Sequence, residues 1–303
     1  MASLLEQTKE LCRFYGIKPA RSKGQNFLIS EKIYDDIVAA ADLKTDDVIL
    51  EVGPGLGFLT AKLALRLRSG QAGQGKVMAV ELDDKLAEAL KTRMQAQGAM
   101  NVEVVNEDIL KMTNDQFPIT NKIPNFKSQI KNFKIVANLP YNITSIFLRK
   151  FLSFDHAQDG EAEIKPELMV LLLQKEVAER ICAQAGAMSL LAVSVQFYAR
   201  PEIVEAVKKE NFWPEPEVDS AIVKISPHLN PLLGKEREEK EFFRLVKFGF
   251  SAKRKMLKNN LAAGLRMEVE LVSERLAAAG FNPKIRAQEL AVADWHKLFS
   301  IFN

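Results

Sequence analysis

Apolar stretches long enough for one buried strand alternate with helical patterns through the first two-thirds of the chain. This alternation restricts the fold more than any other feature, because a repeated strand–helix–strand order builds a parallel sheet covered by helices on both faces. Between the second and third stretches, Leu86, Leu90 and Met94 recur at helical spacing. The expected strands cover residues 47–53, 76–83, 101–108, 133–140 and 167–174. We therefore predict an α/β domain.

A glycine-rich turn, EVGPGLGF, follows the first of these strands and contains Gly53, Gly55 and Gly57. Such a turn between a strand and a helix is typical of a nucleotide-binding site, because glycine permits close approach of the backbone to a ligand. Phe58 stands where the dinucleotide fingerprint requires its third glycine. We therefore expect Gly53 and Gly55 to bind a cofactor other than a dinucleotide. A tight turn without a ligand is the simpler alternative.

Polar residues follow the other expected strands. Glu81 ends the second strand, Asp108 follows the third, and Asn138 ends the fourth. Ligands of open α/β sheets bind outside the carboxyl ends of the strands, and charged residues are seldom buried without a partner. A carboxylate at Glu81 suits ribose hydroxyls, and one at Asp108 suits the exocyclic amine of adenine. The pattern fits adenosine without a pyrophosphate, which points to S-adenosylmethionine.

The sequence Asn138-Leu139-Pro140-Tyr141 ends the fourth strand in an unusual way. Pro140 keeps Leu139 out of the helical conformation and has no backbone N–H, so the turn can aim carbonyl oxygens outward. The Asn138 side chain and the Leu139 carbonyl can then accept both hydrogens of one amino group, while a base stacks on Tyr141. This suits methyl transfer to an exocyclic amine, where positioning supplies most of the effect. The alternative is an ordinary turn with a half-buried tyrosine.

A second aromatic residue, Phe212, precedes Pro214 and Pro216 in the segment NFWPEPEVDSAIV. The prolines stiffen this loop, so we expect it to hold Phe212 against the other face of a base that has left its stack. The alternative is that Phe212 and Trp213 cover the hydrophobic core.

The last third of the chain has a different pattern. Residues 194–207 and 220–227 read as strands without a long helix between them, so we expect the sheet to end in an antiparallel hairpin. Prolines and a charge cluster in residues 226–240 indicate a linker, with a domain boundary near residue 230. The residues that follow the linker have a helical pattern. We therefore expect an N-terminal extension (1–23), a first domain (24–228) and a small helical domain (235–303).

Basic residues with no acid among them occur near the start of the helical domain. They are Lys247, Lys253, Arg254, Lys255 and Lys258. A helix that carries these residues suits binding along a nucleic-acid phosphate backbone. A solvated helix face is the alternative. The formal net charge of +3 permits a nucleic-acid partner without requiring one.

Composition argues against several other classes of protein. The chain has 303 residues and only two cysteines, Cys12 and Cys182, and its three histidines are far apart. We therefore predict neither a disulfide framework nor a metal site. The N-terminus carries charges where a signal peptide needs an apolar core, and the longest strongly apolar run, residues 168–173, is too short to cross a membrane. We expect a cytoplasmic, monomeric protein.

The motifs above occur together with GQNFL (24–28), LLQKEVAERI (172–181), FSAKRKMLKNNL (250–261) and RAQELAVADWHKLF (286–299). From about Gly24 to its C-terminus, the chain resembles the small-subunit ribosomal RNA adenine dimethyltransferases of the KsgA type. The resemblance implies a Rossmann-like methyltransferase domain, a small helical domain and S-adenosylmethionine as cofactor. It also implies N6-dimethylation of two adjacent adenines in the hairpin near the 3′ end of small-subunit (16S) rRNA, within a pre-30S particle.

The resemblance assigns roles to individual residues. Contacts with the cofactor are implied for Asn26, Leu28, Gly53, Glu81, Asp108 and Asn138. The implied catalytic motif is Asn138, Leu139, Pro140 and Tyr141, with Phe212 as the second base-stacking residue. Lys23 stands where the family usually has an apolar residue, and residues 69–75 and 113–132 look longer than usual. We expect these departures to affect packing and contacts with RNA or protein rather than the chemistry.

Three other functions stay open at this point. A large-subunit rRNA methyltransferase of the macrolide-resistance type shares the glycine turn and the Asn-Pro-Tyr chemistry, but KRKMLKNNL (253–261) and RAQEL (286–290) favour the small-subunit enzyme. DNA adenine methyltransferases use similar turns, but GQNFL and VDSAIV (218–223) argue against them. The third is a non-catalytic ribosome-assembly factor on the same scaffold, although the residues expected for catalysis are all present.

Overall fold

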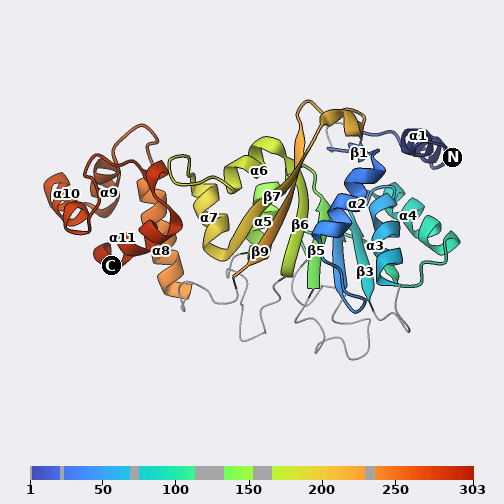
Figure 1. Ribbon diagram of the computed structural model, residues 1–303, viewed down its shortest axis with the longest axis horizontal. Helices are drawn as coiled ribbons and strands as arrows, with labels where there is room; N and C mark the ends of the chain where they lie inside the picture. The colour runs from blue at the N-terminus through green and yellow to red at the C-terminus, as the bar shows by residue number, and fades with distance from the viewer. Residues whose placement is uncertain (1, 21–23, 69–74, 113–132, 153–165, 229–235) are drawn as a thin grey trace. The chain divides into compact units, whose positions relative to one another are not determined.

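The computed structural model describes residues 2–20, 24–68, 75–112, 133–152, 166–228 and 236–303 (Figure 1). The chain forms two compact units. The first comprises Met1–Phe151, His156–Ala178 and Glu202–Pro227, and the second comprises Leu152–Asp155, Glu179–Pro201 and His228–Asn303. The second unit thus takes in residues 179–201, which the sequence placed in the first domain. Lys23, the expected loop 113–132 and all of the loop 69–75 except Gly75 lie outside the described residues.

A seven-stranded sheet of order β4-β3-β2-β5-β6-β9-β7 forms the centre of the first unit. Its strands are β2 (Val48–Val52), β3 (Lys76–Glu81), β4 (Val102–Asn106), β5 (Phe133–Asn138), β6 (Pro166–Gln174), β7 (Ala199–Val207) and β9 (Ser220–Pro227). The pairs β2–β3, β2–β5, β3–β4 and β5–β6 are parallel, whereas β9 is antiparallel to β6. The predicted α/β fold is confirmed.

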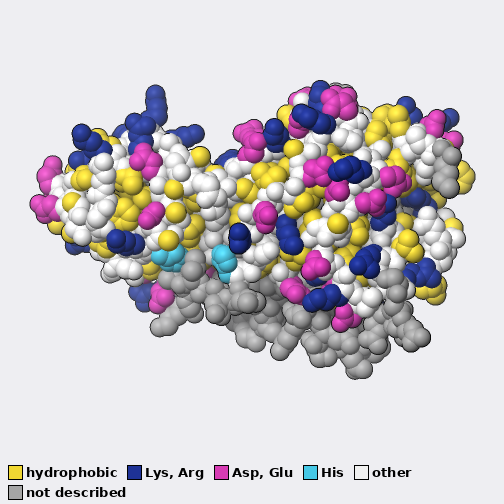
Figure 2. Space-filling view, in the orientation of Figure 1, with side chains coloured by type: hydrophobic (Ala, Val, Ile, Leu, Met, Phe, Trp, Pro, Cys, Tyr) yellow, Lys and Arg dark blue, Asp and Glu magenta, His cyan; other side chains and the backbone are white. Residues whose placement is uncertain are grey.

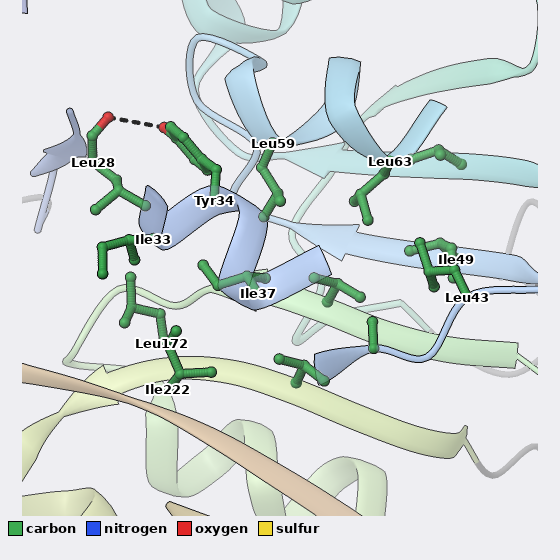
Figure 3. Close-up of a cluster of buried hydrophobic side chains, with 14 of the residues drawn as sticks. Leu28, Ile33, Tyr34, Ile37, Leu43, Ile49, Leu59, Leu63, Leu172 and Ile222 are labelled. Atoms are coloured by element: carbon green, nitrogen blue, oxygen red, sulfur yellow. Dashed lines mark hydrogen bonds between the residues drawn. The ribbon is translucent and has the colours of Figure 1, made fainter. Parts of the chain in front are cut away.

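Three helices cover one face of this sheet: α2 (Glu31–Ala40), α3 (Phe58–Leu67) and α4 (Asp84–Ala96) (Figure 1). Ile37 from α2 and Leu63 from α3 pack against Ile49 of β2 in a buried hydrophobic cluster (Figure 3). All five residues of β2 are buried, as expected for a strand in the interior of a covered parallel sheet. Tyr34 of α2 donates a hydrogen bond of 2.9 Å to the Leu28 carbonyl and so fixes the segment that precedes α2.

The N-terminal helix α1 (Leu4–Phe14) begins with a capping box, in which Ser3 and Glu6 exchange hydrogen bonds. Its buried Cys12 packs in a cluster with Phe27, Leu56 and Leu86. Phe27 belongs to β1 (Phe27–Leu28), which pairs antiparallel with β8 (Phe212–Trp213). The short β1–β8 ladder therefore joins the GQNFL motif to Phe212 and Trp213.

Three short helical elements complete the first unit and its connection to the second. They are α5 (Thr144–Leu152), α6 (Lys175–Ile181) and the single 3₁₀ turn η3 (Lys209–Asn211). Helix α5 follows directly from the Asn-Leu-Pro-Tyr turn, and η3 leads directly into β8.

The second unit is helical and has a core of its own. Its elements are α7 (Leu190–Tyr198), α8 (Glu236–Gly249), α9 (Leu257–Leu265), α10 (Val269–Ala278), the 3₁₀ turn η4 (Ala287–Glu289) and α11 (Val292–Phe302). Phe197, Phe242 and Trp295 are fully or almost fully buried in this core.

One predicted strand is wrong in part. Residues 199–207 form β7, but residues 194–198 are the last turns of α7. Ser189 starts this helix by accepting a hydrogen bond of 3.1 Å from the Ala192 N–H. Val195, Phe197 and Tyr198, which favour strands, lie in a short helix that is largely apolar, so neither periodicity nor β-propensity separates the two structures.

Candidate active site

A cavity of about 390 Å³ lies at the carboxyl ends of β2, β3 and β5. Val52 is in register with Val80 of β3 and with Ala137 of β5, so the three strands end at one level. The cavity is lined by every residue that the sequence predicted for the cofactor and the target base. They are Asn26, Leu28, Gly53, Gly55, Glu81, Asp108, Asn138, Leu139, Pro140, Tyr141 and Phe212.

The glycine turn passes close to the end of β5. Gly53 has a φ of +67°, and a Cβ there would lie 3.5 Å from the Asn138 carbonyl oxygen and 3.7 Å from Pro140 Cδ. Gly55 has a φ of +56°, and a Cβ there would lie 3.2 Å from the Phe27 ring. The positive φ would strain a side chain at either position, and at Gly55 a side chain would also crowd the Phe27 ring.

Glu81 is a buried acid whose carboxylate is already oriented. One oxygen accepts a hydrogen bond of 3.0 Å from the Gly55 N–H, and the other accepts one of 3.0 Å from the Asp83 N–H. Burial raises the pKa of Glu81, and these two backbone donors oppose that rise. The carboxylate therefore ties the glycine turn to the end of β3 and has lone pairs left for a ligand.

Asp108 lies two residues beyond β4 and shapes its own loop. Its Oδ1 accepts a hydrogen bond of 3.0 Å from the Leu110 N–H. Lys150 of α5 donates hydrogen bonds to the carbonyls of Leu110, at 2.9 Å, and Met112. The segment after Asp108 is thus held by the helix that follows the Asn-Leu-Pro-Tyr turn.

That turn presents polar groups to the cavity and apolar groups to the core. Leu139 is 1% exposed, whereas Asn138 and Tyr141 are partly exposed and line the cavity. The Tyr141 hydroxyl lies 2.8 Å from Ser220 Oγ of β9. Burial raises the pKa of Tyr141, so the hydroxyl keeps its proton at neutral pH.

Phe212 also borders the cavity, from β8. It is in register with Leu28 of β1 and is 3% exposed. It belongs to the hydrophobic cluster beneath α2 and α3 as well. Both predicted roles, base stacking and covering the core, are therefore compatible with its position.

Glu51 is a residue of the cavity that the sequence analysis missed. It is 1% exposed and is the fourth of the five residues of β2, and neither carboxyl oxygen makes a hydrogen bond of regular geometry within the described part of the chain. Burial raises its pKa to about 8; the nearby Glu81 carboxylate adds to this effect, and the Thr60 hydroxyl opposes it. The available signal was an acid inside a strand that is otherwise apolar.

Arg93 of α4 is the second residue that was missed. Its guanidinium donates a hydrogen bond to the Leu56 carbonyl in the glycine turn and lies 4.4 Å from the centre of the Phe58 ring. Burial lowers the pKa of Arg93. Arg93 therefore supports the turn from behind, and nothing in its spacing distinguishes it from the surface residues of an amphipathic helix.

These residues fit S-adenosylmethionine. Glu81 and Asp108 bring carboxylate acceptors to the cavity, and the glycine turn leaves room that a Cβ would fill. Glu51 adds a buried carboxyl that makes no regular hydrogen bond to the described residues, so it can pair with a polar group of a ligand. Within the described residues, no group of three or more His, Cys, Asp or Glu side chains is arranged to hold a metal ion.

The basic residues predicted to bind nucleic acid lie in the second unit. Lys247, Lys253, Arg254 and Lys255 are exposed, and Lys258 is partly exposed. Figure 2 shows Lys and Arg side chains gathered along the upper edge of this unit.

The prediction that one helix carries all five basic residues is wrong, because α8 ends at Gly249 and residues 250–256 form a turn before α9. Asn260 causes the break by donating hydrogen bonds of 2.6 Å to the Gly249 carbonyl and 3.1 Å to the Ala252 carbonyl. The three central basic residues therefore project from a turn.

Comparisons with known proteins identify the family of this chain. Curated relatives named ribosomal RNA small subunit methyltransferase A include one from Dehalococcoides mccartyi, which is 43% identical over 98% of this chain and 92% of its own length. Another, from Staphylococcus aureus, is 34% identical over 97% of this chain and 93% of its own length.

Two solved structures share the fold. The 23S rRNA methyltransferase ErmE has a TM-score of 0.68 and 28% identity, covering 91% of this chain and 99% of that one. A dimethyladenosine transferase from Plasmodium falciparum has a TM-score of 0.68 and 26% identity, covering 90% of this chain and 95% of that one. The family model for ribosomal RNA adenine dimethylase matches residues 17–303. This chain therefore belongs to the ribosomal RNA adenine dimethylase family.

Proposed function

We propose that this protein dimethylates the N6 atoms of two adjacent adenines in the 3′-terminal hairpin of small-subunit rRNA, within a pre-30S particle. The observation that carries the proposal is the position of Asn138. It ends β5 at the level where β2 and β3 supply Gly53 and Glu81, so the target-base motif and the cofactor residues share one cavity. The protein is a methyltransferase, and S-adenosylmethionine is its cofactor.

Asn26, Leu28, the glycine turn, Glu81 and Asp108 all line the cavity, which supports a role for them in holding the cofactor. In this proposal Glu81 binds the ribose and Asp108 the adenine. S-adenosylmethionine supplies a methyl group on a sulfonium centre, which is a strong electrophile. What remains for the protein is to present a nucleophile whose lone pair is normally delocalised into the adenine ring.

The Asn138 turn provides this activation by geometry. The Asn138 side-chain oxygen and the Leu139 carbonyl accept the two N6 hydrogens and favour a pyramidal amine. Tyr141 and Phe212 stack on the two faces of the base and offset the cost of taking it out of its stack, at about 1–3 kcal/mol per stacked base. The proton lost from N6 on methylation leaves to solvent, since both groups that contact it are neutral acceptors.

The second unit suits the RNA backbone. Its exposed Lys253, Arg254 and Lys255 project from the turn between α8 and α9, where they are free to follow phosphates. We further propose that residues 24–228 contain the cofactor and base sites and that residues 235–303 contribute RNA binding. We propose a monomer that acts in the cytoplasm. None of the described helices is long and apolar enough to cross a membrane.

One experiment tests the function directly. The protein is incubated with methyl-labelled S-adenosylmethionine and with separate small or large ribosomal subunits that lack the modification. We expect label in small subunits, located on two adjacent N6-dimethyladenines. Label in neither subunit would refute the enzyme, and a non-catalytic assembly factor would then be favoured.

A large-subunit methyltransferase is the second candidate, because the structure resembles ErmE. The curated relatives named for the small subunit are more similar in sequence, at up to 43% identity against 28%. Label confined to the large subunit would select this second candidate.

A further inference from the structure

Ser220 is a buried polar residue at the start of β9. It is 0% exposed, and Ala221, Ile222 and Val223, which follow it, are also buried. Its Oγ lies 2.8 Å from the Tyr141 hydroxyl, and either group can donate in this hydrogen bond. Because a buried hydroxyl is costly without a partner, the pair ties Tyr141 to the sheet.

The register of the sheet places Ser220 at the edge where the cavity lies. Asn138 is in register with Leu172 of β6, and Leu172 with Ile222 of β9. Ser220 pairs with Gln174, two residues further toward the carboxyl end of β6. Ser220 therefore lies just beyond the level of Asn138, where Tyr141 also lines the cavity.

Asp219, the residue before Ser220, stabilises the backbone segment that leads into Phe212. Its Oδ1 accepts a hydrogen bond of 3.0 Å from the Lys209 N–H, and its Oδ2 forms an ion pair of 3.1 Å with Lys208 Nζ. Its carbonyl accepts a hydrogen bond of 3.0 Å from the Lys175 N–H. Lys209 begins η3, and η3 leads directly into Phe212.

We propose that Asp219 and Ser220 are positioning residues that fix the two base-stacking rings relative to each other. Ser220 acts through the Tyr141 hydroxyl, and Asp219 acts through the η3 turn before Phe212. The inference rests on the proposed function, in which both rings stack on one adenine. Two adjacent residues, Ser220 at the start of β9 and Asp219 directly before it, then set the distance between the two rings, so that little ordering is left for the moment of binding.

Two variants test the link to Tyr141. Ser220→Ala removes the partner of the Tyr141 hydroxyl, and Tyr141→Phe removes that hydroxyl but keeps the ring. We expect each to lower the rate of methyl transfer to the small subunit about three- to tenfold, the effect of one hydrogen bond. Affinity for S-adenosylhomocysteine stays at the wild-type level. The double variant loses no more than the greater single loss, because both changes break one interaction.

A spectroscopic signal separates positioning from general damage. RNA with 2-aminopurine at the target position fluoresces more when the base is unstacked, so Ser220→Ala and Tyr141→Phe should both raise the fluorescence of the bound complex. Ser194→Ala is the matched control, since it removes a hydroxyl that donates to the Leu190 carbonyl in α7. It should change neither fluorescence nor rate.

The outcomes are distinct. Wild-type protein that labels no ribosomal subunit refutes the proposed function and removes the basis of the inference. With active wild-type protein, unchanged rate and fluorescence in both variants overturn the role of Ser220, as does a double variant whose losses multiply. If Ser220→Ala fails to fold, Tyr141→Phe alone decides: a normal rate and normal fluorescence refute the link.

Discussion

Asn138 is the residue on which the proposed chemistry depends most, because it joins the cofactor side of the cavity to the target side. Its neighbour Leu139 is buried in the core, so the backbone of the turn is anchored while the amide borders the cavity. Removal of the amide should therefore affect catalysis without loosening the fold.

We expect Asn138→Ala to bind S-adenosylhomocysteine with nearly normal affinity but to transfer methyl groups roughly a hundredfold more slowly, the usual effect of losing one positioned hydrogen-bonding group. Calorimetric titration and single-turnover labelling measure the two properties. Asn138→Asp keeps an acceptor oxygen and should retain more activity than Asn138→Ala. Full activity of Asn138→Ala would contradict the role proposed for the amide.

Glu51 makes stability depend on pH in a predictable direction. Its pKa is raised to about 8 in the folded protein from an ordinary value of 4.5. The folded protein therefore keeps a proton that the unfolded chain loses, and stability falls as pH rises from about 4.5 to 8. Glu51→Gln removes this titration, so its free energy of unfolding relative to wild type should rise over the same range.

Urea unfolding of both proteins at pH 5.5 and pH 8 measures this difference. For one proton, the difference in the free energy of unfolding between the two proteins can change by at most about 1.4 kcal/mol per pH unit. A difference between Glu51→Gln and wild type that is the same at both pH values would show that Glu51 is ionised in the folded protein.

The predicted residues of the cavity share one sequence signal, which Glu51 and Arg93 lack. Glu81, Asp108 and Asn138 are polar residues at the ends of apolar runs, so strand topology alone brings them to one edge. Arg93 contacts the glycine turn from a helix that comes later in the chain, and only the packing of α4 on α3 reveals the contact. Glu51 has a different signal, because it is an acid inside an apolar stretch. Interpreting the whole stretch as a buried strand hides that signal.

At the scale of elements, the hydrophobic pattern of the sequence predicted the strands of the parallel sheet well and the C-terminal helices less well. Strands β2, β3 and β5 lie within the predicted ranges, because a buried strand needs a continuous apolar run bounded by turns. The break between α8 and α9 depends on Asn260, which lies eleven residues after the Gly249 carbonyl that it caps. No local pattern contains that information.

The turn between α8 and α9 can be tested by charge reversal. Arg254→Glu with Lys255→Glu should weaken RNA binding and lower the slope of log affinity against log salt, because about two phosphate contacts are lost. Affinity for S-adenosylhomocysteine should stay unchanged. Lys44→Glu with Lys91→Glu makes the same change in net charge at two exposed residues of the first unit and serves as the control. Unchanged RNA affinity at low salt for the α8–α9 variant would refute the proposed contact.

At the scale of the whole molecule, the two units have separate hydrophobic clusters. One contains Ile49 and Leu63 of the first unit, and the other contains Phe242 and Trp295 of the second. The cavity that we assign to the cofactor is lined by residues of the first unit alone. A ligand of that cavity should therefore stabilise one unit directly.

Differential scanning calorimetry tests this expectation. S-adenosylhomocysteine at a hundredfold excess over its dissociation constant should stabilise the first unit by about 2.7 kcal/mol and raise one of two unfolding transitions. The midpoint temperature of the other transition should not change. One transition that moves as a whole would show that the units unfold together.

The order of the sheet separates the two proposed halves of the site. Strand β5 lies between β2, β3 and β4, which are followed by or end in Gly53, Glu81 and Asp108, and β6, β9 and β7, where Ser220 begins β9. If Ser220 positions Tyr141 as proposed, substitutions at the start of β9 should change how a target base is held while the cofactor half of the site stays unchanged.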